Sequence, residues 1–568
     1  MRVYLRRRFL RVLDALCTNR SIVSDVGATW EEMASSSSLL RAVGNWRDGS
    51  EEWFAGSFER LPETVRVNPL RSDSWWVESW LSEIGSKEIA WFDGPGSAWE
   101  LPFERGKAEG DTKKMLAALH ETGRVTRQES VSMIPVLALG LGEGDMVLDL
   151  CASPGSKTTQ ISEHLMDSGM VVANEISSSR VNTLVSNVQR HGSKSPVVVN
   201  HDGRHIPRMP DRGFDSVLVD APCSGSGTTR KNPEIWGKWS PSGGRSLQGL
   251  QIGLLTRALR MTRPGGRVVY STCSLDPIEN EAVVAEILRK GSGIRLLDAS
   301  KILKEVPGDI GMSSWPVLSE DGSISESDEG EESMAPPTEE WIEESLSKCM
   351  RVWNDKIGGG GFFIAILEKS PDIDDSWGEP QFRQSPSDTK EDLPSSPQPI
   401  GGQVSEAISK SWGSCPPNLW TRGKKILWST PEVSDVWSSE RRIRSGRTLV
   451  PGGRWRPLKV IHIGLETARM RKGEMDRVVA RAAGILVPEM KSGFTEVSLS
   501  VIDGILAGEE PVPSSIGELE GMRGGHLLTC EDLCIPVWIG GRVTLMLNES
   551  EKTVLHSQRG IVGNVEEE

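Results

Sequence analysis

The chain has 568 residues, of which 37% are hydrophobic, so it is too long for a single core and apolar enough for two or three globular domains. Eight cysteines without the close spacing of a disulfide framework exclude a small stapled fold and favour a reducing compartment, for which we expect the cytoplasm, or the nucleus in a eukaryote. The formal net charge of −14 excludes a protein that binds polyanions through its overall charge, but not one with a local basic groove.

The first ten residues carry four arginines but no apolar core of the kind that directs secretion. An exposed basic helix is the favoured interpretation of this start, and a mitochondrial-type leader is the alternative. No stretch of the sequence approaches the roughly eighteen apolar residues of a membrane span. We therefore expect no membrane association.

Residues 1–110 are rich in tryptophan and have poor hydrophobic periodicity, which indicates a small mixed domain. Residues 115–140 have a helical pattern. From Met146 onward, short apolar runs alternate with helical segments, which is typical of a parallel sheet covered by helices. The predicted strands are short, rich in β-branched or aromatic residues and suited to burial on both faces: 147–150, 170–173, 197–200, 216–219, 267–271 and 362–367.

Two segments interrupt this pattern. Residues 319–345 are dense in acidic residues and serine, and such a composition predicts an insertion loop before the last strand. Residues 371–415 are rich in serine and proline, which indicates a flexible linker. Apolar runs at 458–463, 484–487 and 534–539 then predict a β-rich domain over residues 416–568. The predicted fold is therefore α/β, with the sheet in residues 111–370 between a mixed N-terminal domain and a β-rich C-terminal domain.

The turn after the first predicted strand reads Asp149-Leu150-Cys151-Ala152-Ser153-Pro154-Gly155-Ser156-Lys157 and precedes a predicted helix. Such a turn places backbone amides at the edge of the sheet where α/β proteins bind ligands. It has one glycine, Gly155, whereas dinucleotide fingerprints and P-loops need more glycines at fixed offsets. Nicotinamide cofactors and ATP are therefore disfavoured.

Three carboxylates follow predicted strands along the chain. Glu175 is placed to reach ribose hydroxyls, Asp202 can accept a hydrogen bond from an adenine amino group, and Asp220 is the third. A single such carboxylate is more often a helix cap, but three together favour a nucleoside site. S-adenosylmethionine fits, because its adenosine needs acceptors and its sulfonium and amino groups favour an acidic pocket. The predicted cofactor-binding residues are Cys151, Ala152, Ser153, Pro154, Gly155, Ser156, Lys157, Glu175, Asp202 and Asp220.

Two cysteines also end predicted strands, Cys223 after Asp220-Ala221-Pro222 and Cys273 after Ser271-Thr272. A thiolate is the side chain best able to add to an electron-poor ring carbon, so two thiols beside one cofactor indicate thiol chemistry. Cys530 and Cys534 have no matching histidine or second cysteine pair, so no metal site is predicted. We interpret three other cysteines as small, buried, inert hydrophobic residues: Cys17, Cys349 and Cys415.

The two cysteine segments are long and specific: Asp220-Ala221-Pro222-Cys223-Ser224-Gly225-Ser226-Gly227-Thr228 and Ser271-Thr272-Cys273-Ser274-Leu275-Asp276-Pro277-Ile278-Glu279-Asn280-Glu281-Ala282-Val283. With the turn at 149–157 they resemble the Nol/Nop/Sun family of RNA cytosine-5 methyltransferases, in particular the tRNA-modifying branch with an extra C-terminal domain. The resemblance runs from about residue 61 to 369 and continues more weakly through 420–562. It implies a Rossmann-like methyltransferase sheet and methyl transfer from S-adenosylmethionine to carbon 5 of cytosine in RNA, for which we expect tRNA.

The resemblance also implies catalytic roles. Cys273 would add to carbon 6 of the cytosine, which makes carbon 5 nucleophilic. Asp220 would hydrogen-bond ring nitrogen 3 in protonated form or pass it a proton, a role that burial at a strand end favours. Cys223 would help to remove the carbon-5 proton so that the enzyme is released. Lys157 would lie near the active site, and a solvent-facing helix residue is the equally weighted alternative.

An enzyme of this kind must act on an unpaired or extruded cytosine, because stacking hides carbon 6. Trp236 and Trp239 are predicted either to stack on bases or to lie in the core. The two terminal domains offer no convergent titratable groups, so we interpret them as RNA-gripping modules. Phosphate contacts are expected from basic residues that have solvated surface charge as their alternative role: Arg230, Lys231, Lys238, Arg245, Arg257 and Arg260.

Two alternatives stay open, an rRNA substrate and a non-catalytic RNA-binding scaffold. A scaffold would have no need for Asp220, Cys223 and Cys273 together. DNA cytosine methyltransferases attack with the cysteine after proline, which here is Cys223. Ser153 and Glu175 stand where the family more often has Ala and Asp, which affects the fine geometry of the cofactor site. We expect a monomer.

Overall fold

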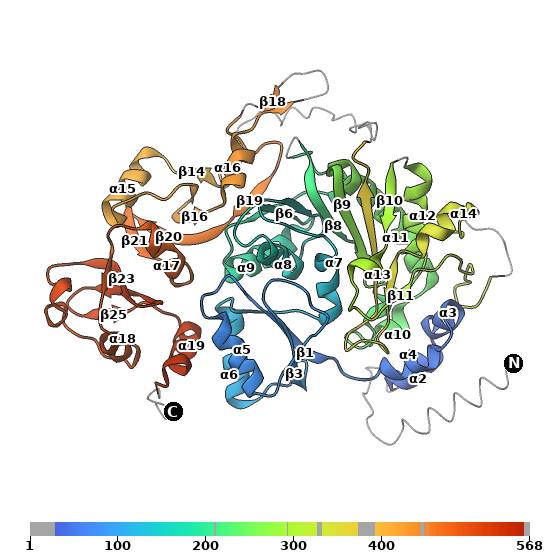
Figure 1. Cartoon of the computed structure of the whole chain (residues 1–568), viewed down its shortest axis with the longest axis horizontal. Coiled ribbons are helices and arrows are strands. Elements are labelled where there is room, and N and C mark those ends of the chain that lie inside the picture. Colours follow the sequence, from blue (N-terminus) through green and yellow to red (C-terminus); the bar gives the residue numbers. More distant parts are fainter. Residues whose placement is uncertain are drawn as a thin grey trace.

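The computed structural model describes residues 29–209, 212–291, 293–325, 332–372, 392–442, 448–450 and 452–561 (Figure 1). A ten-stranded sheet lies at its centre, in the order β11-β12-β13-β9-β8-β5-β6-β7-β19, with β10 paired to β13. Five strands run parallel: β5 (Met146–Asp149), β6 (Met170–Asn174), β7 (Pro196–Val199), β8 (Phe214–Asp220) and β9 (Thr262–Thr272). The antiparallel members are β10 (Ile294–Leu297), β11 (Asp309–Ile310), β12 (Met350–Val352), β13 (Phe362–Lys369) and β19 (Val460–Ile463).

Helices cover both faces of this sheet, which confirms the predicted α/β, Rossmann-like fold. Consecutive residues of one strand face opposite sides: Val147 packs with Ile161 of α8 (Ser156–His164), while Leu148 packs in the cluster that contains Leu254 of α11 (Pro241–Met261). The other covering helices are α7 (Ile134–Leu137), α9 (Ser178–His191), α12 (Glu281–Lys290) and α13 (Ala299–Ile302). The six predicted sheet strands are confirmed as β5, β6, β7, β8, β9 and β13.

The N-terminal part combines a four-stranded sheet with short helices. The sheet has the order β2 (Lys87–Glu88), β3 (Ala98–Glu104), β1 (Pro62–Val67) and β4 (Val125–Arg127). The predicted helix over 115–140 is wrong after its first turns, because α6 (Gly110–Glu121) ends before Gly123, whose φ of +73° starts the turn into β4. This sheet therefore extends past residue 110, where we placed the domain boundary. The other helices are α2 (Trp30–Ser35), α3 (Ser38–Trp46), α4 (Ser50–Gly56) and α5 (Ser74–Glu83).

Two segments expected to be loops contain helices. In the acidic insertion, residues 326–331 lie outside the described residues, but α14 (Glu340–Leu346) buries Ile342 and Leu346 in the core. In the predicted linker, residues 373–391 lie outside the described residues, whereas β14 (Gln398–Pro399) and α15 (Gly402–Trp412) follow. In both α14 and α15, apolar residues recur four positions apart within an otherwise polar segment, so that one face of each helix can be buried. The basic start, residues 1–28, also lies outside the described residues.

The C-terminal part contains two further principal sheets and several helices. One sheet has the order β14, β15 (Leu419–Arg422), β16 (Lys425–Trp428), β20 (Leu465–Arg471) and β21 (Glu474–Val478). The other consists of β22 (Phe494–Glu496), β23 (Gly524–Cys530), β24 (Leu533–Ile539) and β25 (Val543–Leu545). The extra β-rich region is thus confirmed, although the run 484–487 falls mainly in helix α17 (Ala480–Leu486). The remaining elements are β17 (Arg441–Arg442), β18 (Thr448–Val450), α16 (Pro431–Ser438), α18 (Leu499–Leu506) and α19 (Glu549–Arg559).

One C-terminal strand belongs to the central sheet. β19 pairs antiparallel with β7, with Val460 opposite Val199 and Ile463 opposite Val197. The apolar run at 458–463, which we assigned to a separate domain, therefore covers the otherwise open edge of the large sheet. Figure 1 shows the remaining C-terminal sheets on that side of the molecule, with α19 beside α6. In the described part of the chain, no helix is both long and apolar enough to cross a bilayer.

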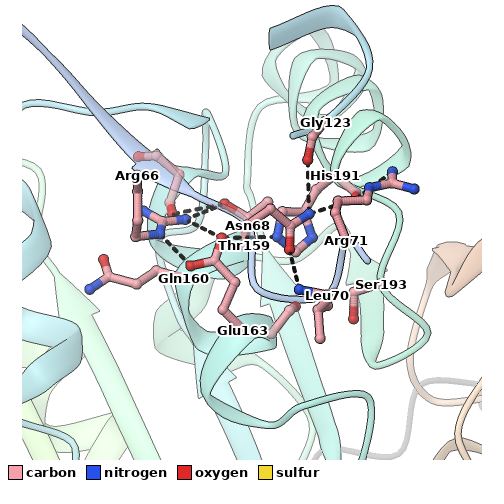
Figure 2. A network of polar contacts seen from close by, with 12 residues as sticks. Arg66, Asn68, Leu70, Arg71, Gly123, Thr159, Gln160, Glu163, His191 and Ser193 are labelled. Atoms are coloured by element: carbon pink, nitrogen blue, oxygen red, sulfur yellow. Dashed lines mark hydrogen bonds and ion pairs between the residues drawn. The ribbon is translucent and has the colours of Figure 1, made fainter. Parts of the chain in front are cut away.

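A buried polar network joins the N-terminal sheet to the central sheet (Figure 2). The Arg66 guanidinium donates to Thr159 Oγ1 at 3.1 Å and to Glu163 Oε1 at 3.0 Å, and His191 Nε2 lies 3.0 Å from the same oxygen. Burial alone would raise the pKa of Glu163, but the charge of Arg66 and the hydrogen bonds from His191 and Arg66 hold that pKa below its ordinary value. The network therefore depends on Arg66 as the partner of a fully buried carboxylate.

Replacing Arg66 by methionine should destabilise the protein strongly. Breaking a buried ion pair costs about 3–5 kcal/mol, because the Glu163 carboxylate keeps its desolvation penalty and loses its partner. Urea unfolding followed by circular dichroism measures the change. Arg60→Met is the control, since the Arg60 pair with Glu104 is exposed and its loss should cost at most about 1 kcal/mol. Equal losses in the two variants would contradict this assignment.

Candidate active site

The carboxyl ends of β5, β8 and β9 converge on a cleft of about 580 Å³ that is lined by Lys157, Asp220 and Cys273, among others. Lys157, in the first turn of α8, donates from Nζ to Asp220 Oδ2 at 2.8 Å and to Ser132 Oγ at 2.7 Å. Ser271, at the end of β9, donates to Asp220 Oδ1 at 2.9 Å. Asp220 is thus held from both sides, and Lys157 points into the site rather than into solvent.

Asp220 is less desolvated than we expected. Its side chain is 28% exposed and forms an ion pair with the Lys157 ammonium. The structure therefore gives this carboxyl a cationic neighbour in place of an apolar surrounding. The Lys157 ammonium, whose Nζ lies 2.8 Å from Asp220 Oδ2, can therefore supply a proton to this carboxylate.

The two cysteines lie side by side. β8 and β9 are neighbouring parallel strands, with Asp220 opposite Ser271, so the loops after them run together. The Sγ atoms of Cys223 and Cys273 are 3.2 Å apart, and both thiols are free. The hydrogen bond to Cys273, burial and the negative charge of Glu279 raise the pKa of Cys223 well above its ordinary value. Of the two, Cys273 lines the cleft, so it is the thiol that a bound molecule meets.

The turn after β5 is tied to α9. Gly155 has a φ of +113°, and a Cβ there would lie 2.9 Å from Leu184 of α9, so the turn needs glycine. Asn187 donates to the Pro154 carbonyl at 2.7 Å, and Arg180 donates to the Ser153 carbonyl at 2.7 Å. The Ser153 hydroxyl donates to the Arg180 carbonyl at 3.2 Å. The hydroxyl that departs from the family pattern is therefore used to hold the turn against the helix.

The acidic residues stand at the ends of β6 and β7, as predicted. Glu175 accepts from the Ser177 amide at 2.8 Å and lies 3.5 Å from Arg180, while Asp202 accepts from the Arg204 side chain at 3.1 Å. Ile176 is 61% exposed beside Glu175, which gives this edge an apolar surface for a flat ring. Two acceptors and an apolar face, without a glycine-rich phosphate cradle, fit the adenosine of S-adenosylmethionine. A bound nucleoside would share these carboxylates with the two arginines.

The family comparison agrees with this geometry. Residues 136–368 match the model for the 16S rRNA methyltransferase RsmB/F. The predicted resemblance to the Nol/Nop/Sun family is confirmed over this methyltransferase domain. A multisite-specific tRNA:(cytosine-C(5))-methyltransferase of Saccharomyces cerevisiae is 38% identical over 325 residues, which are 53% of this chain and 47% of that protein. A tRNA (cytosine(34)-C(5))-methyltransferase of Drosophila melanogaster is 40% identical over 276 residues, 44% of this chain and 37% of that protein.

The chain spans about half the length, or less, of those curated relatives. Among solved structures, a methyltransferase homologue from Pyrococcus horikoshii is 26% identical, with a TM-score of 0.45, over 58% of this chain and 93% of that one.

Three of the six basic residues expected on RNA have structural roles instead. Arg230 donates to the carbonyls of Glu59 and Gly359 at 2.9 Å each, and the buried Arg257 donates to the Ile206 carbonyl at 2.9 Å. Arg245 donates to the Leu318 carbonyl at 3.0 Å. The remaining three differ in position, since Lys231 lines the cleft, Lys238 is exposed and Arg260 is half-buried.

The tryptophans near the cleft are core residues. Trp236 meets Trp53 edge to face with ring centroids 5.5 Å apart, and Trp239 meets Trp46 in the same way at 5.7 Å. Both are almost fully buried, so of the two predicted roles only the core role is supported. They fix the N-terminal helices against α10 (Ile235–Lys238).

Several site residues were not predicted. Ser132 and Ser271 hold the Lys157–Asp220 pair, and both lie within conspicuous sequence segments, so a closer reading of those segments could have found them. Basic residues that line the cleft come from the N-terminal sheet and α9, and nothing in the local sequence marks them: Arg105, Arg127 and Arg190. Only the packing of distant elements brings them to the active site.

Asp149, at the end of β5, gives the protein a specific pH dependence. Burial raises its pKa from 3.8 to about 7, and its Oδ2 accepts from Thr158 Oγ1 at 2.7 Å. Because the folded state holds this proton more tightly than the unfolded state, the contribution is complete below about pH 4 and is lost as the pH rises through 7. The free energy of unfolding should therefore fall between pH 4 and 7, by at most about 1.4 kcal/mol per pH unit from this group.

Asp149→Asn should flatten that fall, as measured by urea unfolding from pH 4 to 8. Asp202→Asn is the matched control at a strand end. The hydrogen bond from Arg204 lowers the pKa of Asp202, so its contribution changes only below pH 4. A profile for Asp149→Asn as steep as that of the wild type would show that another group titrates.

Proposed function

We propose that the protein transfers a methyl group from S-adenosylmethionine to carbon 5 of cytosine in RNA, and that the RNA is tRNA. The observation that carries the proposal is the pair of free thiols 3.2 Å apart beside the Lys157–Asp220 ion pair, at one cleft. The two curated relatives named above are tRNA cytosine-5 methyltransferases, which supports tRNA over rRNA. The family model, named for 16S rRNA enzymes, keeps rRNA as the second candidate.

In the proposed reaction, Cys273 loses its thiol proton to solvent and its Sγ forms a bond to carbon 6, so that the ring gains electron density at nitrogen 3 and carbon 5. Asp220 lies beside nitrogen 3, and the Lys157 ammonium supplies the proton that the ring nitrogen takes up through that carboxyl. The neutral adduct avoids a full negative charge on the ring. S-adenosylmethionine, held at the ends of β5, β6 and β7, supplies the methyl group to carbon 5.

Release requires loss of the carbon-5 proton and cleavage of the bond between Cys273 and carbon 6. Cys223 is the neighbouring group in the proposed arrangement. Because its raised pKa keeps the resting thiol protonated, Cys223 must first lose its own proton to water, and the thiolate then accepts the carbon-5 proton. The carbon-5 proton leaves to this base, directly or through water, and the electrons of that C–H bond restore the ring double bond. The bond between carbon 6 and Sγ breaks with its electron pair on sulfur, so Cys273 departs as a thiolate, and nitrogen 3 returns its proton to the Asp220–Lys157 pair.

The target base must be out of its stack to reach the cleft. Arg105, Arg127, Arg190 and Lys231 lie around the cleft, and we propose that they contact phosphates of the flanking nucleotides. The terminal regions 1–110 and 416–568 are proposed to grip the remainder of the RNA. We further propose that the protein acts as a monomer in the cytoplasm, or in the nucleus of a eukaryotic cell.

A transfer assay with methyl-labelled S-adenosylmethionine tests the function. The full chain is incubated separately with tRNA and with rRNA, and bisulfite sequencing locates the product. Label at a cytosine of tRNA is the expected result, and label in rRNA alone would support the second candidate. Absence of label from every RNA, with RNA binding retained, would support a non-catalytic scaffold instead. Bisulfite sequencing of cellular RNA with and without the protein then identifies the modified position.

A further inference from the structure

Glu279 is a buried acidic residue with contacts to both cysteine loops. It lies between β9 and α12, and its side chain is inaccessible to solvent. Oε1 accepts from the Ser224 backbone amide at 2.8 Å and from Gln251 Nε2 at 3.1 Å. Oε2 accepts from the hydroxyls of both Ser224 and Ser274. Four donors therefore converge on one carboxylate, which has the acceptor capacity to bind all of them.

Two of these donors are the direct neighbours of the two cysteines in the sequence. Ser224 directly follows Cys223, and Ser274 directly follows Cys273. The carboxylate of Glu279 thus bridges the two residues next to the two cysteines. A further bond fixes the Cys223 loop, since Gln251 also donates to the Pro222 carbonyl at 2.9 Å, and the two serine hydroxyls that donate to Glu279 lie 3.1 Å apart.

We propose that Glu279 is a positioning residue that holds the two cysteine loops in register and so fixes the Cys223–Cys273 distance. It does not line the cleft and would not touch the substrate. The kinetic consequence of this inference rests on the proposed function, whereas the chemical state of the thiols can be measured without RNA. Charge contributes as well as geometry, because Glu279 is one of the groups that raise the pKa of Cys223, after the hydrogen bond to Cys273 and burial.

A merely structural carboxylate is available for comparison on the same segment. Glu281 is fully buried and forms an ion pair with Arg351, which donates to the Leu275 carbonyl at 2.9 Å. It also accepts from the Met312 amide at 2.9 Å. Glu281 therefore matches Glu279 in burial and position in the chain, but within the described residues it forms no hydrogen bond with Ser224 or Ser274.

The experiment compares Glu279→Gln with Glu281→Gln in the full chain. Alkylation of Cys223 by iodoacetamide is followed by mass spectrometry of its peptide at several pH values. Removing the negative charge of Glu279 should lower the pKa of that thiol, so alkylation at a pH below that pKa should be about tenfold faster. Covalent capture of an RNA that contains 5-fluorocytosine should slow by roughly 100-fold, because the loops are no longer held together. Glu281→Gln should reduce thermal stability and change neither rate beyond a few-fold.

Ser274→Ala separates geometry from charge, because it removes one bridge and keeps the carboxylate. Capture should slow by roughly tenfold without the tenfold gain in Cys223 alkylation. Capture at the wild-type rate by Glu279→Gln would overturn the proposal, as would equal effects of Glu281→Gln on both rates. If Glu279→Gln does not fold, wild-type capture by Ser274→Ala overturns it instead. Failure of the wild-type chain to capture any RNA, with the alkylation difference intact, would refute the proposed function and leave the positioning role standing.

Discussion

Cys273→Ala should abolish covalent capture of RNA and reduce methyl transfer by on the order of 10⁴-fold or more, because the variant lacks the atom that bonds to carbon 6. The structure favours Cys273 as the nucleophile on access, since Cys273 lines the cleft, whereas Cys223, 3.2 Å away, is not among the lining residues. Incubation with 5-fluorocytosine RNA followed by denaturing electrophoresis measures capture. RNA affinity, measured by filter binding, should stay within a few-fold of the wild type.

Cys223→Ala is the control for that experiment and should give the opposite result. Without the release group, the adduct between Cys273 and unmodified RNA should accumulate as a slowly migrating band on the denaturing gel. Its accumulation should require S-adenosylmethionine if the step that fails follows methyl transfer. Accumulation in Cys273→Ala together with loss in Cys223→Ala would mean that the two cysteines exchange roles, as in enzymes that attack with the cysteine after proline.

Asp220→Asn should reduce turnover by roughly 10²–10⁴-fold, the range expected when a group that transfers a proton is removed. Lys157→Met should cause a loss of the same order, because Lys157 is the charged partner of Asp220 at 2.8 Å. The losses of turnover caused by the two substitutions should not add in the double variant, because both substitutions interrupt the same proton path. Single-turnover methyl transfer with labelled S-adenosylmethionine measures each rate.

Ser271→Ala provides the matched control, because it removes a neutral hydrogen bond to the same carboxylate and leaves the ion pair. A loss of about tenfold is expected from one hydrogen bond. Full additivity of Asp220→Asn and Lys157→Met would show that the two residues act independently, which would contradict the shared proton path.

The central sheet could be predicted from sequence because its information is local. Strands such as β6 and β7 are short runs of valine and alanine buried on both faces, so the run itself identifies the strand. The predicted helix over 115–140 was wrong because the helical pattern of α6 runs on in the sequence past Gly123, whereas the helix itself ends at Glu121. A Cβ at Gly123 would lie 2.0 Å from the Arg190 carbonyl, so the chain must turn where α9 packs against it. That constraint comes from another element and is invisible in the local sequence.

In the candidate site, too, the residues within local motifs could be predicted, whereas the contacts made by distant elements could not. Cys223, Cys273 and Asp220 were predicted as site residues because Asp220 ends a strand and each cysteine follows one, within distinctive motifs, and parallel strands bring their ends together. The environment of Asp220 could not be predicted, because Lys157 reaches it from a different strand-helix unit. The contrast is greater for the arginines: Arg230 and Arg257 look like RNA ligands in the sequence, yet each is used to bind backbone carbonyls.

The pairing of β19 with β7 has a consequence for how the protein is made. The edge of the central sheet stays open until the ribosome has synthesised residue 463, nearly one hundred residues after β13 ends at Lys369. During that interval the backbone of β7 can pair with strands of other chains. A gene truncated after Lys369 would encode the cleft residues Lys157, Asp220 and Cys273, but its product should aggregate during expression. We therefore expect the catalytic portion and the C-terminal extension to fold as one unit.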